Sequence, residues 1–310
     1  MMNLNLGYTE SAGSPALREE ISRWYPSLQP DQIVVTSGAE EAIFISMQIL
    51  LNAGDEVIVQ TPAYQSLTEI PAAIGCRVIP WMMNEEDGKW VRHPSDLNEM
   101  ITPATRAVVI NSPHNPTGHH FSPDEWREIR EICADRKVKI ISDEVYRGAE
   151  HSSSPELPAM ADGNESGYSL GVMSKALGLA GLRIGWIASP DTGFIGNFLR
   201  FKDYTTICNS GPSEYLATLA LQNKEEILRR NNRILRDNLG ILSNFMDRHS
   251  ERLSWAIPKA GSTAFPRLAG SVSGESFCTR LLNDTGILLL PGSVFGVDTP
   301  HFRIGYGRRD

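Results

Sequence analysis

The fold of this chain follows most clearly from YSLGVMSKALGLAGLRIGWIAS, residues 168–189. The apolar run from Tyr168 to Met173 predicts a buried strand, and a second strand is expected to start at Arg183. Lys175 stands alone between the two, at the start of a turn that contains several glycines. Burying a lysine is unfavourable unless its charge is neutralised or used. The fold must therefore give the Lys175 amine a partner or a covalent role.

The composition of the chain limits the classes of protein to consider. Its 310 residues can bury a large core, and the length predicts one large domain and one smaller domain. Hydrophobic residues make up 41% and charged residues 21%, as is typical of a globular enzyme. The formal net charge of -8 argues against nucleic acid or an anionic membrane as the main partner.

Targeting signals and cysteines point to the cytoplasm. No apolar run reaches the length of about 18 residues that a membrane span needs. The first residues, MMNLNLGYTESAGS, lack a basic region and a long apolar core, so we expect no signal peptide. The four cysteines are scattered without C-x-x-C spacing. This pattern favours reduced thiols over a disulfide framework or a zinc site, and with it a cytoplasmic location.

Short β-type runs alternate with helical patterns through most of the chain. One helix is expected to end near residues 52–54, and another to start at Ser122 as N-cap, with Pro123 next and Glu125 completing a capping box. This alternation predicts an α/β fold, with a mostly parallel sheet between helices on both faces. The strand candidates are 56–59, 76–81, 106–112, 138–144, 168–174 and 182–188.

A second, smaller domain is predicted at the C-terminal end. A long helical pattern over 223–248 connects to it, and one further helix is expected near 274–282. We therefore divide the chain into a large domain, 1–222, and a region of connecting helix and small α+β domain, 223–310. The strand candidates of this small domain are 252–258, 262–268, 286–291 and 301–306.

Ligands of open α/β sheets bind at the carboxyl ends of the strands. The residues just after the predicted strands are therefore the candidates for a site. They are Ser37, Gly38 and Ala39, Tyr64, residues 111–118, residues 143–146, Ser174, Lys175 and Arg183.

These residue types suit a phosphorylated aromatic cofactor. The helix N-terminus at residues 37–39 suits a phosphate, and Arg183 can clamp the same phosphate. Asp143 can hold a protonated ring nitrogen, and Lys175 loses its charge if it forms a Schiff base with an aldehyde. Asn115 and Tyr146 can bond a ring hydroxyl, and Tyr64 can stack on the ring. Together these groups predict a pyridoxal phosphate (PLP) site.

Several ordered motifs resemble the signatures of class I/II, fold-type I aminotransferases. They are NSPHNPTG (111–118), SDEVY (142–146), SKALGLAGLRIGW (174–186), PGSVFG (291–296) and FRIGYGR (302–308). The matches run in family order from Tyr8 to Arg308, so the resemblance covers almost the whole chain. It implies a fold-type I architecture, pyridoxal 5'-phosphate as cofactor, and transfer of an amino group between an L-amino acid and a 2-oxo acid.

The resemblance also implies residue roles. Lys175 resembles the family's cofactor-linked lysine, which moves the substrate's α-proton. Asp143 resembles the acid that keeps the ring nitrogen protonated, and Tyr146 the tyrosine that bonds the ring oxygen. Asn115 is assigned to that oxygen and to the substrate. The residues assigned to the phosphate and the ring face are Ser37, Gly38, Ala39, Tyr64, Ser174 and Arg183.

Two further residues carry the remaining implications of the resemblance. Arg303 resembles the arginine that binds the substrate's α-carboxylate with paired hydrogen bonds. Tyr8 resembles the tyrosine that reaches across a dimer interface to the partner's cofactor phosphate. The resemblance therefore implies a homodimer with two shared sites.

The sequence departs from the family pattern in places. The family usually has a phosphate-binding serine where this chain has Val172, so one hydrogen bond of roughly 0.5–1.5 kcal/mol is expected to be missing. Ser174 remains, and we expect weaker cofactor retention. Family members also commonly have an N-terminal arm before the Tyr8 region and a helix after the last arginine. We expect the arm to be short or missing and the C-terminal end to be truncated.

Two other functions stay open. One is a PLP-dependent lyase, cyclase or decarboxylase of a specialised amino-acid pathway, because residues outside the motifs choose among the outcomes of the shared chemistry. The other is an inactive cofactor-binding or scaffold remnant, which the short ends favour. Formation of the pyridoxamine cofactor from an amino acid, and its reversal by a 2-oxo acid, separates transamination from both.

Two weaker signals are interpreted conservatively. His119 and His120 suggest a metal, but no third ligand has suitable spacing, so we predict a solvated loop and no metal site. Gly178, Gly181 and Gly185 do not form G-x-G-x-x-G, so a dinucleotide site has little support.

Overall fold

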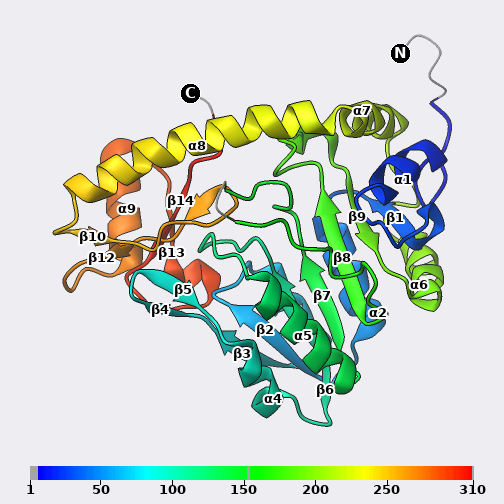
Figure 1. Cartoon of the computed structure of the whole chain (residues 1–310), viewed down its shortest axis with the longest axis horizontal. Helices are drawn as coiled ribbons and strands as arrows, with labels where there is room; N and C mark the ends of the chain where they lie inside the picture. The colour runs from blue at the N-terminus through cyan, green and yellow to red at the C-terminus, as the bar shows by residue number, and fades with distance from the viewer. Residues whose placement is uncertain (1–5, 152–153, 309–310) are drawn as a thin grey trace.

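A seven-stranded sheet forms the centre of the computed structural model, which describes residues 6–151 and 154–308 (Figure 1). Neighbouring strands are parallel except around β9, which runs antiparallel to both β1 and β8. The predicted α/β fold with a mostly parallel sheet is confirmed. In spatial order the strands are β1 (Ile33–Thr36), β9 (Gly185–Ala188), β8 (Gly167–Val172), β7 (Lys139–Asp143), β6 (Thr105–Asn111), β2 (Glu56–Thr61) and β3 (Arg77–Met82).

Both faces of this sheet are covered. Successive residues of a strand point to opposite faces, and β6 shows this: Val109 packs in one apolar cluster, whereas Val108 and Ile110 pack in another. Because the central strands are buried on both faces, they appear in the sequence as continuous apolar runs. The helices on the Val109 face are α2 (Ala39–Leu50), α3 (Ser66–Ile74) and α6 (Thr192–Lys202), and those on the other face are α4 (Leu97–Met100) and α5 (Pro123–Asp135).

Helix starts follow the predicted chemistry. In α5 the Ser122 hydroxyl accepts from the Glu125 backbone N–H at 3.3 Å, and the Glu125 carboxylate accepts from the Ser122 N–H at 2.7 Å. The predicted capping box is therefore confirmed. A third apolar cluster packs α1 (Pro15–Ser22) and α7 (Gly211–Gln222) around Trp186 of β9.

The sequence did not predict some elements near the edges. Strand β1 was not among the strand candidates, and β9 starts at Gly185 rather than at Arg183. Arg183 adopts a left-handed conformation (φ 53°) after a 3-10 turn, Ala180–Leu182, which delays the strand. A hairpin of β4 (Asn84–Glu86) and β5 (Lys89–Val91) turns at Asp87 and Gly88, which both have positive φ, as an Asp-Gly turn prefers.

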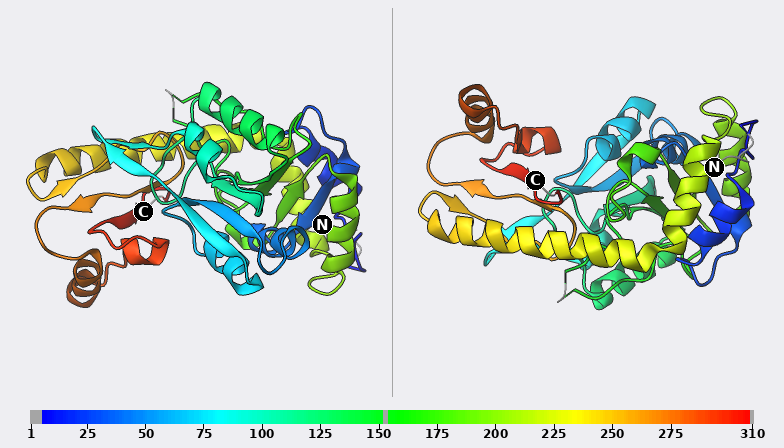
Figure 2. Two further views of the ribbon diagram at one scale, coloured as in Figure 1. Left: turned by 90° about the horizontal axis from the view of Figure 1, so that it is seen from below. Right: turned by 90° about the horizontal axis from the view of Figure 1, so that it is seen from above.

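The C-terminal part consists of short elements at the far end of α8 (Lys224–Arg248), which confirms the predicted long helix. In Figure 1 α8 runs along the upper edge of the molecule, and in the right-hand view of Figure 2, seen from above, it crosses in front of the other elements. The expected strand at 262–268 divides into strands of two different sheets, because Pro266 between them has no N–H to donate. The elements are β10 (Leu253–Ser254), β11 (Thr263–Ala264), β12 (Arg267–Leu268), α9 (Gly274–Thr285), β13 (Leu290–Pro291) and β14 (Phe302–Gly305).

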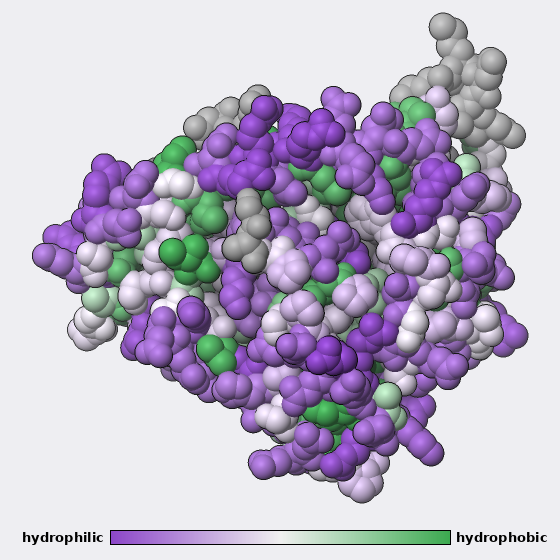
Figure 3. Space-filling model, viewed as in Figure 1, coloured by the Kyte–Doolittle hydropathy of each residue, from purple (hydrophilic) through white to green (hydrophobic). Residues whose placement is uncertain are grey.

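The surface in the view of Figure 3 is mainly hydrophilic, with small and scattered hydrophobic patches. Within the described ranges, no helix is long and apolar enough to span a bilayer. The stretch used to judge a signal peptide begins with residues 1–5, which lie outside the described residues.

Candidate active site

The predicted site residues gather at one edge of the large sheet. Strands β1, β2, β6, β7 and β8 end there, and β9 starts there because it runs in the opposite direction. The sheet therefore brings together segments that lie far apart in the sequence. They include Ser37 after β1, Tyr64 after β2, Asn115 after β6, Asp143 at the end of β7, Lys175 after β8 and Arg183 before β9.

Asp143 is a buried acid, with 4% of its surface exposed. Its Oδ1 accepts a hydrogen bond from the Val145 backbone N–H at 3.2 Å, and Asn111 Nδ2 donates to its backbone carbonyl at 2.8 Å. Burial raises the pKa of Asp143 to about 7, and the charge of Lys175 acts in the opposite direction. A positively charged N–H group beside this carboxyl would stabilise its ionised form.

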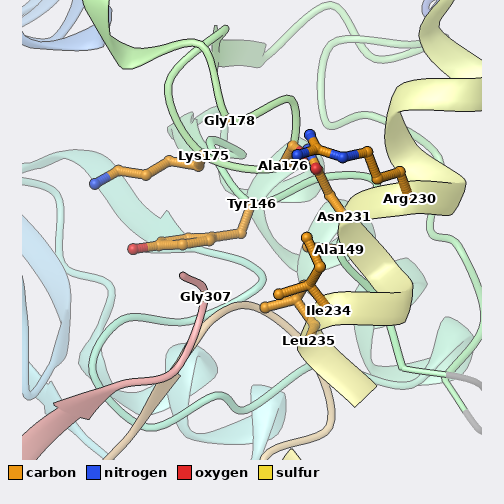
Figure 4. A pocket seen from close by; sticks show the side chains of 10 residues that line it. All are labelled: Tyr146, Ala149, Lys175, Ala176, Gly178, Arg230, Asn231, Ile234, Leu235 and Gly307. Carbon is orange, nitrogen blue, oxygen red and sulfur yellow. The ribbon is translucent and has the colours of Figure 1, made fainter. Parts of the chain in front are cut away.

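Lys175 and Tyr146 line one cavity, and their side chains point the same way, away from the α8 residues that also line it (Figure 4). Lys175 Nζ lies 5.7 Å from the centroid of the Tyr146 ring. Partial desolvation and then the charge of Arg303 lower the pKa of Lys175, while Asp143 raises it. Burial raises the pKa of Tyr146 to about 12. The lowered lysine pKa increases the fraction of neutral amine, which is the nucleophilic form.

The cavity beside Lys175 has a volume of about 190 Å³ and reaches the long helix α8. Arg230, Asn231 and Leu235 of α8 line it together with Gly307 (Figure 4). Asn231 Nδ2 donates to the Ala176 carbonyl at 2.9 Å. This bond fixes the backbone next to Lys175 to α8.

The N-terminus of α2 and Arg183 form a cradle of a kind that suits an anion. Gly38, the N-cap of α2, has φ 81°, and a Cβ on it would lie 2.6 Å from Arg183 Nη2. Only glycine allows so close an approach of the guanidinium. Ser174 Oγ is buried without a hydrogen-bond partner. The Ser37 N–H already donates to Glu41 Oε2 at 2.6 Å, so the open donors are those of the first turn of α2.

Arg303 comes from β14 and reaches the sheet edge from the C-terminal part. Its Nη1 donates to Asn115 Oδ1 at 3.2 Å, and its guanidinium carbon lies 5.3 Å from the centroid of the Phe295 ring. The Asn115 backbone N–H donates to Asn111 Oδ1 at 2.6 Å. The predicted substrate-side arginine therefore contacts one of the predicted cofactor-side residues.

Four residues at the margins have different positions. Tyr64 is 40% exposed. Its partial burial is the main cause of its raised pKa, and the negative charge of Glu40 adds to the shift. Ala39 and Val172 pack with Tyr146 in a small apolar cluster. Tyr8 is 91% exposed and has no hydrogen bond or ring contact with the other site residues among the described part of the chain. The single chain therefore does not bring Tyr8 into its own site.

The prediction of a solvated loop at His119 and His120 is wrong. His119 is 5% exposed and His120 is 3% exposed. The His119 ring packs edge-on against Phe121, and His120 Nε2 lies 3.0 Å from the Pro155 carbonyl. The turn before them is held under the C-terminal part, where the Lys259 N–H donates to the Gly118 carbonyl. Among the described residues no group of three or more His, Cys, Asp or Glu could hold a metal ion.

The site residues fit a phosphorylated pyridine cofactor. The hydroxyl of Ser174 lacks a partner, the cradle excludes a side chain at Gly38, and the buried acid Asp143 has a raised pKa. Together with the mostly parallel sheet, they define the class as a pyridoxal-phosphate-dependent enzyme of fold type I.

The chain belongs to the class I and II aminotransferases, whose family model matches residues 1–310. It is 31% identical to the arginine–pyruvate transaminase of Pseudomonas aeruginosa over 319 residues, which cover 97% of this chain and 78% of that protein. Among solved structures, a PLP-dependent aminotransferase from Streptococcus suis matches with a TM-score of 0.90 and 34% identity, covering 98% of this chain and 79% of that one. The PLP-dependent cyclase OrfR matches with a TM-score of 0.91 and 31% identity, covering 99% and 81%.

These findings confirm the family, the fold type, the cofactor and the activity expected from the sequence. The protein is a PLP-dependent aminotransferase, which moves an amino group between an amino acid and a 2-oxo acid.

Proposed function

We propose that Lys175 is the lysine to which the cofactor is attached and the group that moves the substrate's proton. The observation that carries this proposal is that Lys175 and Tyr146 line one cavity and point the same way, near the buried Asp143. When bound, pyridoxal phosphate supplies an electron-withdrawing ring that accepts the electron pair released at the substrate's α-carbon. Lys175 Nζ, with its lowered pKa, would take the proton from the substrate's α-carbon and deliver it to the cofactor carbon that keeps the nitrogen.

Asp143 and Tyr146 set the charge around the ring. The Asp143 carboxylate opposes a protonated ring nitrogen, which relieves the unfavourable burial of a lone charge. The Tyr146 hydroxyl and the Asn115 side chain would hold the ring oxygen, and the half-exposed Tyr64 would stack on the ring.

The phosphate is held by the cradle at the N-terminus of α2. Backbone N–H groups of the first turn and the positive end of the helix dipole face it. Ser174 Oγ would donate to it and so gain the partner that it otherwise lacks. Arg183, whose guanidinium lies close to Gly38, would pair with it.

Arg303 binds the α-carboxylate of the substrate. Its guanidinium is oriented by Asn115 and by the Phe295 ring, and a planar guanidinium matches a carboxylate with two parallel hydrogen bonds. Asn115 therefore links the groups that hold the substrate to those that hold the ring.

The protein acts as a cytoplasmic homodimer with a large domain, 1–222, and a smaller C-terminal part, 223–310. The exposure of Tyr8 supports the dimer, because this side chain is free to reach the phosphate of a partner. The free cysteines, Cys76, Cys133, Cys208 and Cys278, support a reducing compartment.

The experiment that tests these roles is a single half-reaction. The holoenzyme, the variant Lys175→Ala and the control Lys89→Ala are mixed with excess amino acid, and the cofactor spectrum is followed. We expect wild type and the control to convert the cofactor to the pyridoxamine form, and a 2-oxo acid to reverse this. Conversion by Lys175→Ala at the wild-type rate would contradict the role of Lys175.

The similarity to a cyclase supports a second candidate function, in which the donor is rearranged rather than transaminated. This reaction releases a product without leaving the pyridoxamine cofactor. Product analysis of the same half-reaction separates the two functions.

A further inference from the structure

His301 lies two residues before Arg303, where the chain enters β14. Its backbone pairs with that of Arg267, so the chain is already extended at this point. Alternate residues of an extended chain share a face. Phe302, between the two, packs against Phe277 of α9 with ring centroids 4.9 Å apart. His301 and Arg303 therefore share the face of the strand that is turned away from α9.

A row of buried aromatic rings connects His301 to Arg303 on this face. The imidazole stacks on Phe265, with centroids 5.0 Å apart and ring planes 16° apart. Phe265 in turn meets Phe295 edge-on at 5.7 Å. The guanidinium carbon of Arg303 lies 5.3 Å from the centroid of the Phe295 ring. Close-packed rings have little room to move, so the position of the imidazole affects that of the guanidinium.

The hairpin of β4 and β5 holds the other end of this row. His301 Nε2 lies 3.4 Å from Glu85 Oε2 on β4, although the two residues are 216 positions apart in the sequence. The Trp90 ring of β5 lies 5.4 Å from the imidazole, between centroids. On the other side of the imidazole, Nδ1 is 2.8 Å from Thr299 Oγ1. An ionised carboxylate can only accept, so Nε2 carries a hydrogen and donates it to Glu85.

Burial of apolar surface alone does not account for this arrangement. Aromatic rings often pack in rows in protein cores, and a phenyl ring at position 301 would fill the same space without needing partners. An imidazole there needs a partner for each nitrogen, because buried polar atoms without hydrogen bonds are unfavourable. Glu85 turns its carboxylate toward this nitrogen, whereas Glu86, next on the same strand, is exposed. The polar contact therefore fixes the orientation of the imidazole.

We propose that His301 is a positioning residue, which fixes the direction in which the Arg303 guanidinium meets the substrate's α-carboxylate. The hairpin holds the imidazole through Glu85, and the rings of Phe265 and Phe295 connect its position to that of the guanidinium. Two parallel hydrogen bonds to a carboxylate need the guanidinium in one plane, so its rotation lowers substrate affinity. The inference rests on the proposed role of Arg303.

A binding experiment on the holoenzyme tests the proposal without turnover. The substitution is made at Glu85, because removal of the buried imidazole would leave a cavity among the rings. Glu85→Ala removes the acceptor, and Glu85→Gln keeps an oxygen that can accept from Nε2. Glu86→Ala, on the same strand, is the control for loss of a negative charge. The probe is hexanoate, which has a carboxylate and no amine, and calorimetry measures its binding.

We expect Glu85→Ala to bind hexanoate about three- to tenfold more weakly than wild type, and the other two variants to stay within about twofold of it. The affinity for the cofactor, measured by absorbance titration, should be that of wild type in all three. General damage to the fold would lower both affinities. Wild-type binding of hexanoate by Glu85→Ala would overturn the proposal, and so would a parallel loss of cofactor affinity.

A double variant shows whether the hairpin acts through Arg303. Arg303→Gln alone should bind hexanoate at least about tenfold more weakly than wild type. Adding Glu85→Ala should then change the affinity by less than about twofold, because the guanidinium that it orients is gone. An equal loss from Glu85→Ala in both backgrounds would contradict the positioning role.

Failure of the proposed function gives a different result. If Arg303→Gln binds hexanoate as wild type does, Arg303 is not the carboxylate ligand, and its proposed role fails. Crystal structures of the Glu85→Ala and Glu86→Ala holoenzymes then decide on His301. We expect the contact of 3.2 Å between Arg303 Nη1 and Asn115 Oδ1 to persist in Glu86→Ala and to break in Glu85→Ala. An unmoved Arg303 in Glu85→Ala would show that His301 does not position it.

Discussion

The sheet edge and the C-terminal part hold their functional side chains in different ways. Asp143 ends a strand whose last four residues are buried, in a sheet covered on both faces. Arg303 lies on β14, a short strand of a three-stranded sheet, and is partly exposed. The first group is fixed by the core of the protein, and the second by a few contacts with Asn115 and Phe295.

This difference separates the two tasks of the enzyme. Changes at the sheet edge should alter cofactor binding and chemistry. Changes on β14 should alter substrate binding and leave the cofactor in place. Each variant below is a test of whether the two regions can be separated in this way.

Lys175→Ala should have the largest effect. Loss of the amine removes the cofactor linkage and the proton carrier, so we expect turnover to fall by about 10³-fold or more. The variant should still bind the cofactor, because the phosphate cradle is untouched. Steady-state kinetics and equilibrium dialysis measure the two properties. A modest loss of turnover would show that another group moves the proton.

Asp143→Asn should lower turnover by about 10²- to 10³-fold, because the ring nitrogen loses its counter-charge. Without cofactor the same variant should change the pH dependence of stability. Burial raises the pKa of Asp143 from 3.8 to about 7. The protonated acid therefore stabilises the fold fully below pH 3.8, and this contribution is lost as pH rises through about 7.

Urea titrations of the cofactor-free proteins at several pH values measure this contribution. Relative to Asp143→Asn, the free energy of unfolding of wild type should fall by up to about 4 kcal/mol across that window. Taking the difference between the two proteins removes the contribution of the buried histidines, which titrate in both. A difference that does not depend on pH would mean that Asp143 is already ionised in the folded, cofactor-free protein.

Arg303→Gln should raise the KM for the amino acid by about 10- to 100-fold, because losing a hydrogen bond to a charged group weakens binding by about this factor. Its affinity for the cofactor should remain that of wild type. Arg267→Gln on the neighbouring strand β12 is the control for loss of a positive charge. Parallel losses of substrate and cofactor affinity would show that the two regions are not independent.

Ser174→Ala should have the smallest effect. Loss of one hydrogen bond should weaken cofactor binding by about two- to tenfold. The cofactor-free variant should be as stable as wild type or more stable, since the buried hydroxyl has no partner there. Cofactor titration followed by absorbance, and thermal unfolding with and without cofactor, check both expectations.

The regions also differ in how well the sequence predicts them. The buried strands of the large sheet produce long apolar runs, so their positions and the functional residues after them could be predicted. The reversed direction of β9 could not, because an apolar run contains no information on strand direction. In the C-terminal part the apolar stretches at 252–258 and 262–268 suggested strands much longer than those formed.

One feature near the site was missed for a physical reason. His119 and His120 follow a turn and are polar, so exposure was the natural expectation. They are buried because the C-terminal part packs over this turn, a contact between segments far apart in the sequence.

The role of Lys175 is tested by the visible spectrum of the purified protein with pyridoxal phosphate, followed by borohydride reduction and peptide mapping. We predict a yellow absorption band and a reduced pyridoxyl group on Lys175 alone, because its amine is the one that lies beside Asp143 and Tyr146 with a lowered pKa. Absence of the band, or label spread over surface lysines, would contradict the assignment of this sheet edge as the catalytic site.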